Sequence, residues 1–251
     1  MIEIIPAVLP VDFEEVREKA GLVAGRVPLM QLDVCDGRFV PSRSWPYTGT
    51  DPHHDRFFKK IIEQNEGLPH WQKLNYEIDA MVAEPTRAFV DDWIIAGAAR
   101  IILHLESTSP HSLKEIIQHI LGRLDSSAFL EIGLALGLET PLDAVSEYLE
   151  DIDVVQFMGI ECVGYQGQEF AGERVLERVR TFHAAHPEIP ISVDGGVNPE
   201  HARVLVEAGA SRLIVGSAIF GNPVTDRVSA EFSSLTETSV STALAKFKEI
   251  L

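Results

Sequence analysis

The sequence Ile191-Ser192-Val193-Asp194-Gly195-Gly196-Val197-Asn198 joins an apolar strand to the start of a helix. The carboxylate of Asp194 ends the strand, and Asn198 followed by Pro199 is typical of a helix cap and a first helical residue. The two glycines let backbone N–H groups approach an anion closely. We therefore expect either a tight strand-to-helix turn or a turn that also binds phosphate.

The same strand-then-helix unit recurs along the whole chain. Short apolar runs predict strands at residues 2–9, 28–35, 73–82, 100–105, 129–136, 154–158, 189–194 and 212–215. Helical periodicity and caps predict helices at residues 12–25, 56–64, 85–96, 109–124, 142–149, 172–185, 199–208 and 239–251.

Eight such repeats with buried, unalternating strands predict an α/β protein: a single (β/α)8 TIM barrel over residues 1–251, closed by a C-terminal helix. An open, doubly wound sheet is the alternative. The first strand is not followed by a glycine-rich dinucleotide fingerprint, and no stretch resembles an interdomain linker, so the barrel is favoured. The least regular segments, 36–55 and 221–237, are expected to be an active-face loop and a surface excursion.

Charge and cysteine content limit the partners. The 251 residues include 21 basic and 38 acidic side chains, a net charge of −17, which argues against binding to nucleic acid or to an anionic membrane. A phosphate would have to be held locally, by backbone N–H groups or a nearby Arg. Two cysteines cannot form a disulfide framework, and no apolar run reaches membrane-spanning length. We expect a cytoplasmic protein.

Residues at the carboxyl ends of the strands should converge on one face of a barrel. Alternation along residues 28–35 sends Gln31, Asp33 and Cys35 to the same side, the lumen. We expect His104 to be a structural or substrate-rim histidine that pairs with Glu106. Further side chains at these ends are Asp79, Met81, Met158, Asp194, Gly216 and Ser217. A cluster of buried carboxylates favours a divalent cation or shared protons.

Four stretches resemble the ribulose-phosphate 3-epimerase family, and the resemblance runs nearly end to end. One stretch is Leu32-Asp33-Val34-Cys35-Asp36-Gly37-Arg38-Phe39-Val40-Pro41, in which the part from Asp36 to Pro41 is the most specific motif. The others are Pro6-Ala7-Val8-Leu9-Pro10-Val11-Asp12-Phe13, Val193-Asp194-Gly195-Gly196-Val197 and Val215-Gly216-Ser217-Ala218-Ile219-Phe220.

This resemblance implies a metal-assisted 1,1-proton transfer on a phosphorylated ketose, through an enediolate stabilised by the metal. Asp33 and Asp194 would be the acid/base pair. The phosphate would be held by Gly164, Tyr165, Gln166, Gly167, Gly195, Gly196, Gly216 and Ser217. The substrate rim would comprise Cys35, Met81, His104 and Met158. By resemblance alone, a homo-oligomer is also expected.

The main differences from the family pattern lie at the metal-ligand positions. Two positions that resemblance assigns to histidine ligands are Gln31 and Asp79 here. The metal-binding set would then be Asp33, Asp79, Asp194 and Gln31, and these oxygen ligands favour Mg²⁺ or Mn²⁺ over Zn²⁺.

Two other functions stay open from the residues. One is an enediolate lyase or synthase of the same barrel group, and the other is a non-catalytic phosphosugar-binding barrel. A Schiff-base aldolase does not fit, because no Lys lies at the carboxyl end of a predicted strand.

Overall fold

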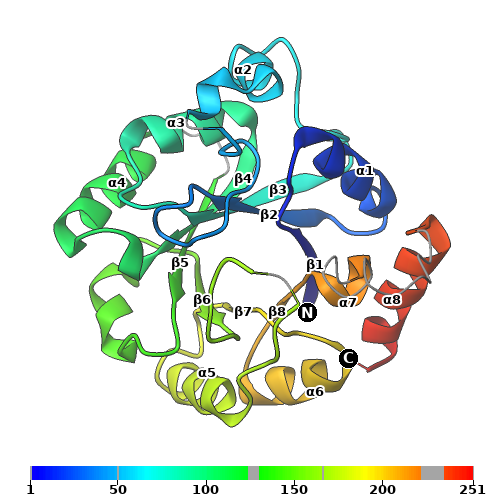
Figure 1. Cartoon of the computed structure of the whole chain (residues 1–251). Coiled ribbons are helices and arrows are strands. Elements are labelled where there is room, and N and C mark those ends of the chain that lie inside the picture. Colours follow the sequence, from blue (N-terminus) through cyan, green and yellow to red (C-terminus); the bar gives the residue numbers. More distant parts are fainter. Residues whose placement is uncertain (1, 50, 124–129, 166, 222–234, 251) are drawn as a thin grey trace.

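The computed structural model describes residues 2–49, 51–123, 130–165, 167–221 and 235–250. Eight parallel strands pair in sequence order, and β8 closes on β1 to complete a barrel with the helices outside it (Figure 1). The predicted (β/α)8 TIM barrel is confirmed, and the open-sheet alternative is wrong. No helix within the described ranges combines the length and the apolar character that a membrane crossing requires.

The bounds lie within a few residues of those predicted. The strands are β1 (Glu3–Val8), β2 (Leu29–Cys35), β3 (Asn75–Met81), β4 (Ala98–His104), β5 (Glu131–Leu136), β6 (Val154–Met158), β7 (Ile191–Asp194) and β8 (Arg212–Val215). The α-helices are α1 (Phe13–Val23), α2 (Arg56–Ile62), α3 (Arg87–Ala96), α4 (Pro110–Arg123), α5 (Glu173–Ala185), α6 (Pro199–Ala208), α7 (Ser217–Phe220) and the closing α8 (Glu237–Ile250). Three short 3₁₀ helices are η1 (Pro52–His54), η2 (Leu105–Ser107) and η3 (Leu142–Tyr148).

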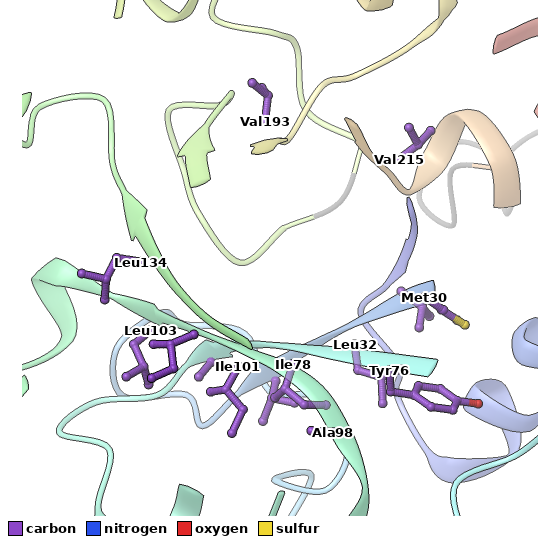
Figure 2. Packing of buried hydrophobic residues seen from close by; sticks show 14 of the residues in the cluster. Met30, Leu32, Tyr76, Ile78, Ala98, Ile101, Leu103, Leu134, Val193 and Val215 are labelled. Carbon is purple, nitrogen blue, oxygen red and sulfur yellow. The ribbon is translucent and has the colours of Figure 1, made fainter. Parts of the chain in front are cut away.

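The main apolar core lies between the barrel and its helices. Successive strand residues point to opposite faces of the sheet, so Met30 and Leu32 of β2 lie on the same face as Tyr76 and Ile78 of β3 (Figure 2). Their neighbours Gln31, Asp33 and Asp79 therefore face the lumen. Because of this alternation, a strand that packs apolar side chains against the helices also places polar side chains in the barrel interior.

Part of the loop after β2, which was expected as an active-face loop, is buried. Trp45 is 1% exposed and packs against Phe13, Phe58 and Trp93, so part of the loop belongs to the core. A large aromatic ring gains more from burial than from a place at the surface. Within the expected excursion at 221–237, residues 222–234 lie outside the described residues.

One departure from the expected elements concerns the segment after β5. The expected helix there is the 3₁₀ helix η3, and no side chain caps its first turn at Pro141. The tighter i→i+3 geometry is typical of such short connectors.

An ion network lies at the amino-terminal end of the barrel, buried at Arg100 and Glu77 and exposed at Glu3. Arg100 of β4 donates hydrogen bonds to Glu77 and Glu131, and its side chain is 5% exposed. Arg212 Nε lies 3.1 Å from Glu3 Oε2. These charges lie at the opposite end of the strands from the convergence of Asp33, Asp79 and Asp194, so they serve stability.

We predict that Arg100→Met lowers the free energy of unfolding by about 3–5 kcal/mol, because Glu77 would keep a buried charge without its partner. Chemical denaturation measures the change. Arg180→Met, which removes the exposed pair with Glu173, is the matched control and should have little effect. Equal losses in the two variants would contradict the prediction.

Candidate active site

A pocket opens at the carboxyl ends of the strands. It brings together both predicted acid/base residues and most of the predicted phosphate and rim residues. These are Asp33, Asp194, Gly164, Tyr165, Gly167, Gly195, Gly196, Gly216, Ser217, Met81 and Met158. Sequence reasoning did not assign Ile160, Gln168, Val197 or Ile214 to this lining. Gln166 lies outside the described residues.

The turn after β7 presents backbone atoms to this pocket. Gly195 and Gly196 have φ of +107° and +66°, which side chains rarely tolerate. A Cβ on Gly196 would lie 2.6 Å from the Phe170 Cα, so the glycine also lets the loop after β6 approach. Asn198 caps α6 by accepting from the His201 N–H, and His201 Nδ1 lies 2.7 Å from the Gly196 carbonyl oxygen. Contacts from the first turn of α6 thus hold the glycine turn in place.

Ser44 fixes the end of β2, where Asp33 lies. Its hydroxyl donates to the Asp33 carbonyl at 2.6 Å and accepts from the Cys35 N–H at 2.8 Å. The Cys35 side chain is fully buried against Met81, with 3.9 Å between the two sulfurs, and burial raises the pKa of its thiol. Cys35 therefore lies behind the pocket wall as an unreactive thiol, not on the pocket lining.

An amide lies between the two aspartates of the predicted pair. Gln31 Nε2 donates to Asp33 Oδ1 and to Asp194 Oδ2, both at 2.8 Å. Gln31 is fully buried in the lumen beneath the pocket lining. The side chain of Gln31, from β2, is therefore hydrogen-bonded to an aspartate of β7 as well as to one of its own strand.

A second glutamine, Gln156 of β6, was missed by sequence reasoning. Its Nε2 lies 3.4 Å from both Asp79 Oδ2 and Asp194 Oδ2. Strand alternation would have placed it in the lumen, two residues before Met158 on the same face. A Gln inside an otherwise apolar strand was the available signal.

Asp79 and His104 form a buried pair below the pocket. His104 Nε2 lies 2.8 Å from Asp79 Oδ1, and the two side chains are 1% and 0% exposed. Burial lowers the pKa of His104, but the charge and hydrogen bond of Asp79, together with the charges of Glu106 and Asp194, outweigh that effect and leave the pKa raised. The expected partner Glu106 instead accepts from the Gly137 N–H and the Thr140 hydroxyl. The ring of His104 thus contacts Asp79 and not Glu106, and His104 is not among the residues that line the pocket.

Asp33, Asp79 and Asp194 form a cluster that could hold a divalent cation. One oxygen from each carboxylate lies within 4.8 Å of the other two. Oxygens bound to one cation at about 2.0–2.6 Å lie at most about 5 Å apart, so the residues fit such an ion. Gln31 presents its N–H groups to two of these carboxylates, so a ligand role for its oxygen requires the amide to turn over.

Burial and neighbouring carboxylates raise the pKa values of Asp33 and Asp194. Desolvation, followed by the charges of Asp194 and Asp79, raises the pKa of Asp33 well above its ordinary value. Desolvation, followed by the charge of Asp79, raises the pKa of Asp194 to about 8. A carboxyl group with the pKa of Asp194 can both take up and release protons near neutral pH.

We predict that, in the presence of a chelator, Asp194 makes the wild-type protein less stable as the pH rises from about 4 to about 8. The folded state keeps the Asp194 proton up to pH about 8, whereas the ordinary pKa is 3.8, so folding binds a proton between these values. Denaturation of wild type and Asp194→Asn across this range measures the effect. As the pH rises, the unfolding free energy of wild type should fall relative to that of Asp194→Asn.

Added Mn²⁺ should raise the melting temperature of the wild type more at pH 8 than at pH 5, because ligands must lose their protons to bind metal. If the unfolding free energies of wild type and Asp194→Asn, measured with chelator, changed in parallel with pH, the raised pKa of Asp194 would be contradicted.

Comparison with known proteins shows which family the chain resembles. The sequence profile of the ribulose-phosphate 3 epimerase family matches residues 3–220. The chloroplastic ribulose-5-phosphate-3-epimerase of Arabidopsis thaliana is 32% identical over 225 residues, which is 88% of this chain and 72% of that protein. The ribulose-phosphate 3-epimerase of Bacillus subtilis is 28% identical over 227 residues, which is 88% of this chain and 93% of that protein.

Solved structures agree on the fold. KGPDC from Streptococcus mutans has a TM-score of 0.65 at 13% identity, with 100% of this chain and 99% of that chain covered. A 3-hexulose-6-phosphate synthase has a TM-score of 0.62 at 16% identity, with 96% and 99% covered. The fold is shared with these structures, and the match over residues 3–220 shows that this chain belongs to the ribulose-phosphate 3-epimerase family.

Proposed function

We propose that this protein is an epimerase acting on a phosphorylated ketose, and that it inverts the carbon beside the ketone by proton transfer between two aspartates. The observation that carries the proposal is that Asp33 and Asp194, from β2 and β7, line one pocket together with the glycine turns. Family membership and the names of the relatives support the same reaction.

The two carboxylates have complementary tasks. One takes the proton from the carbon beside the ketone, and the electron pair moves onto the ketone oxygen to give an enediolate. The other returns a proton to the opposite face of that carbon, which inverts its configuration. The exchange requires one group to start ionised and the other protonated, and in the protein without a cation the raised pKa values of Asp33 and Asp194 favour keeping a proton on the pair.

The three clustered carboxylates would hold a divalent cation. An all-oxygen set favours Mg²⁺ or Mn²⁺ over Zn²⁺. Such an ion would supply Lewis-acid stabilisation of the negative charge that develops on the substrate.

The phosphate would lie against the glycine turns at the other side of the pocket. Gly164, Gly167, Gly195, Gly196 and Gly216 place main chain at the pocket surface. Main-chain N–H groups bind phosphate without a long-range field. This matters because the net charge of −17 repels an anionic substrate at a distance.

We predict that Asp33→Asn and Asp194→Asn each reduce exchange of the substrate's α-hydrogen with solvent by about 10²–10⁴-fold, the usual contribution of a general acid or base. The measurement is deuterium uptake into ribulose 5-phosphate and other ketose phosphates, with and without Mg²⁺ or Mn²⁺. Binding of the same ligands should persist in both variants. Exchange at the wild-type rate in either variant would contradict the proposal, and binding without exchange by wild type would indicate a non-catalytic binder.

We predict that Gly196→Val weakens binding of sugar phosphates and of inorganic phosphate by at least about tenfold, or about 1.4 kcal/mol. The valine would collide with the Phe170 main chain and displace the turn. Calorimetric titration measures the affinity. Gly25→Val is the matched control, because Gly25 also has a positive φ but has open space where a Cβ would lie. Unchanged phosphate binding in Gly196→Val would place the phosphate elsewhere.

A further inference from the structure

We propose that Gln31 is a positioning residue that aligns the acid/base pair by donating one N–H group to each aspartate. This inference rests on the proposed function, since it concerns the same two carboxylates. It adds a role for a residue that lies behind the pocket and outside its lining.

Gln31 spans the lumen between two strands that are not neighbours. β2 and β7 are separated in the barrel by β1 and β8, so main-chain hydrogen bonds do not set the distance between Asp33 and Asp194. Gln31 Nε2 reaches both carboxylates at 2.8 Å. A primary amide has two N–H hydrogens, and this geometry uses one for each aspartate. The amide therefore ties the two carboxylates to a common atom.

The hydrogen bonds also divide the oxygens of the pair into anchored and reactive atoms. Gln31 anchors Asp33 Oδ1 and Asp194 Oδ2, and Gln156 approaches that same Asp194 oxygen at 3.4 Å. In the contacts of the described residues, Asp33 Oδ2 and Asp194 Oδ1 receive neither amide. We assign proton transfer to these two atoms.

Asp79 differs from the pair in this respect. His104 contacts its Oδ1 and Gln156 contacts its Oδ2, so both of its oxygens already have partners. The amide pattern thus separates two aspartates suited to proton transfer from a third that the fold uses as a support. All three carboxylates are otherwise aspartates that cluster in space.

A neutral donor suits this position physically. Two carboxylates that approach one another repel when both are ionised, and they would turn apart without a group between them. An amide offers hydrogens to both without adding charge. Gln31 is 0% exposed, so packing restricts its side chain to few rotamers. The consequence is a pair whose reactive oxygens keep their direction between turnovers.

The test replaces the amide with groups of similar size that donate no N–H. Gln31→Met keeps the length and volume of the side chain, and Gln31→Glu keeps its shape. We expect kcat for α-hydrogen exchange to fall about 10²-fold in both, the effect of a misplacement of about 1 Å, while KM changes less than about threefold. A large fall in kcat with a nearly unchanged KM indicates that the aspartates have lost their alignment while the substrate still binds.

Two controls separate alignment from folding. Ser192→Ala changes another fully buried lumen residue of β7, whose hydroxyl has no hydrogen-bond partner within the described residues, and should leave kcat within about twofold. Inorganic phosphate titration and thermal melting of every variant report an intact pocket and fold. A Gln31 variant that binds phosphate normally but exchanges slowly supports the proposal.

Saturating Mn²⁺ distinguishes positioning from metal ligation. If Gln31 acts through its N–H groups, the loss of kcat in Gln31→Met persists when Mn²⁺ saturates the site. Recovery of the wild-type kcat at saturating Mn²⁺ would overturn the proposal and make Gln31 a ligand.

The remaining outcomes separate this proposal from the proposed function. Wild-type kcat in Gln31→Met or Gln31→Glu, with exchange still abolished by Asp33→Asn and Asp194→Asn, would overturn the role of Gln31 alone. Exchange that survives the aspartate substitutions would overturn the acid/base pair, and the positioning role with it.

Discussion

The site is arranged around the close approach of three buried carboxylates, since one oxygen from each lies within 4.8 Å of the other two. Buried carboxylates repel each other and lose hydration, so each needs a donor or a shared proton. The barrel supplies neutral donors from its own strands: Gln31 between Asp33 and Asp194, Gln156 between Asp194 and Asp79. His104 completes the chain at Asp79. Raised pKa values at Asp33 and Asp194 show that these donors offset the desolvation only in part.

The second constraint is the close approach of main chain at the pocket. Gly159 N–H donates to the Asp194 carbonyl at 2.6 Å, and a Cβ on Gly159 would lie 2.2 Å from the Gly195 carbonyl oxygen. The ends of β6 and β7 can meet only because neither glycine carries a side chain. This contact places Asp194, the glycine turn and the loop after β6 around one volume, which joins the proposed proton transfer to the proposed phosphate contacts.

Local pattern was sufficient for the barrel and for much of the site. Apolar runs separated by capped helical segments predicted the eight strands near their observed bounds, because a parallel barrel buries both faces of each strand. The rule that strand ends converge was enough to predict that Asp33 and Asp194 lie together. Trp45 shows the limit of the same approach: its segment is irregular, and only packing against Phe13, Phe58 and Trp93 makes it part of the core.

By itself, the sequence determined the alternating architecture, the inward direction of Gln31 and Asp33, and the glycines that permit the turn after Asp194, because these follow from strand periodicity and backbone sterics. The tertiary structure decided the partners. Residues 31, 79, 104, 156 and 194 come from five strands, and their hydrogen bonds depend on barrel closure. Thus His104 pairs with Asp79 and not with nearby Glu106, and Gln31 meets an aspartate 163 positions away, because distances across a lumen are set by the closed sheet.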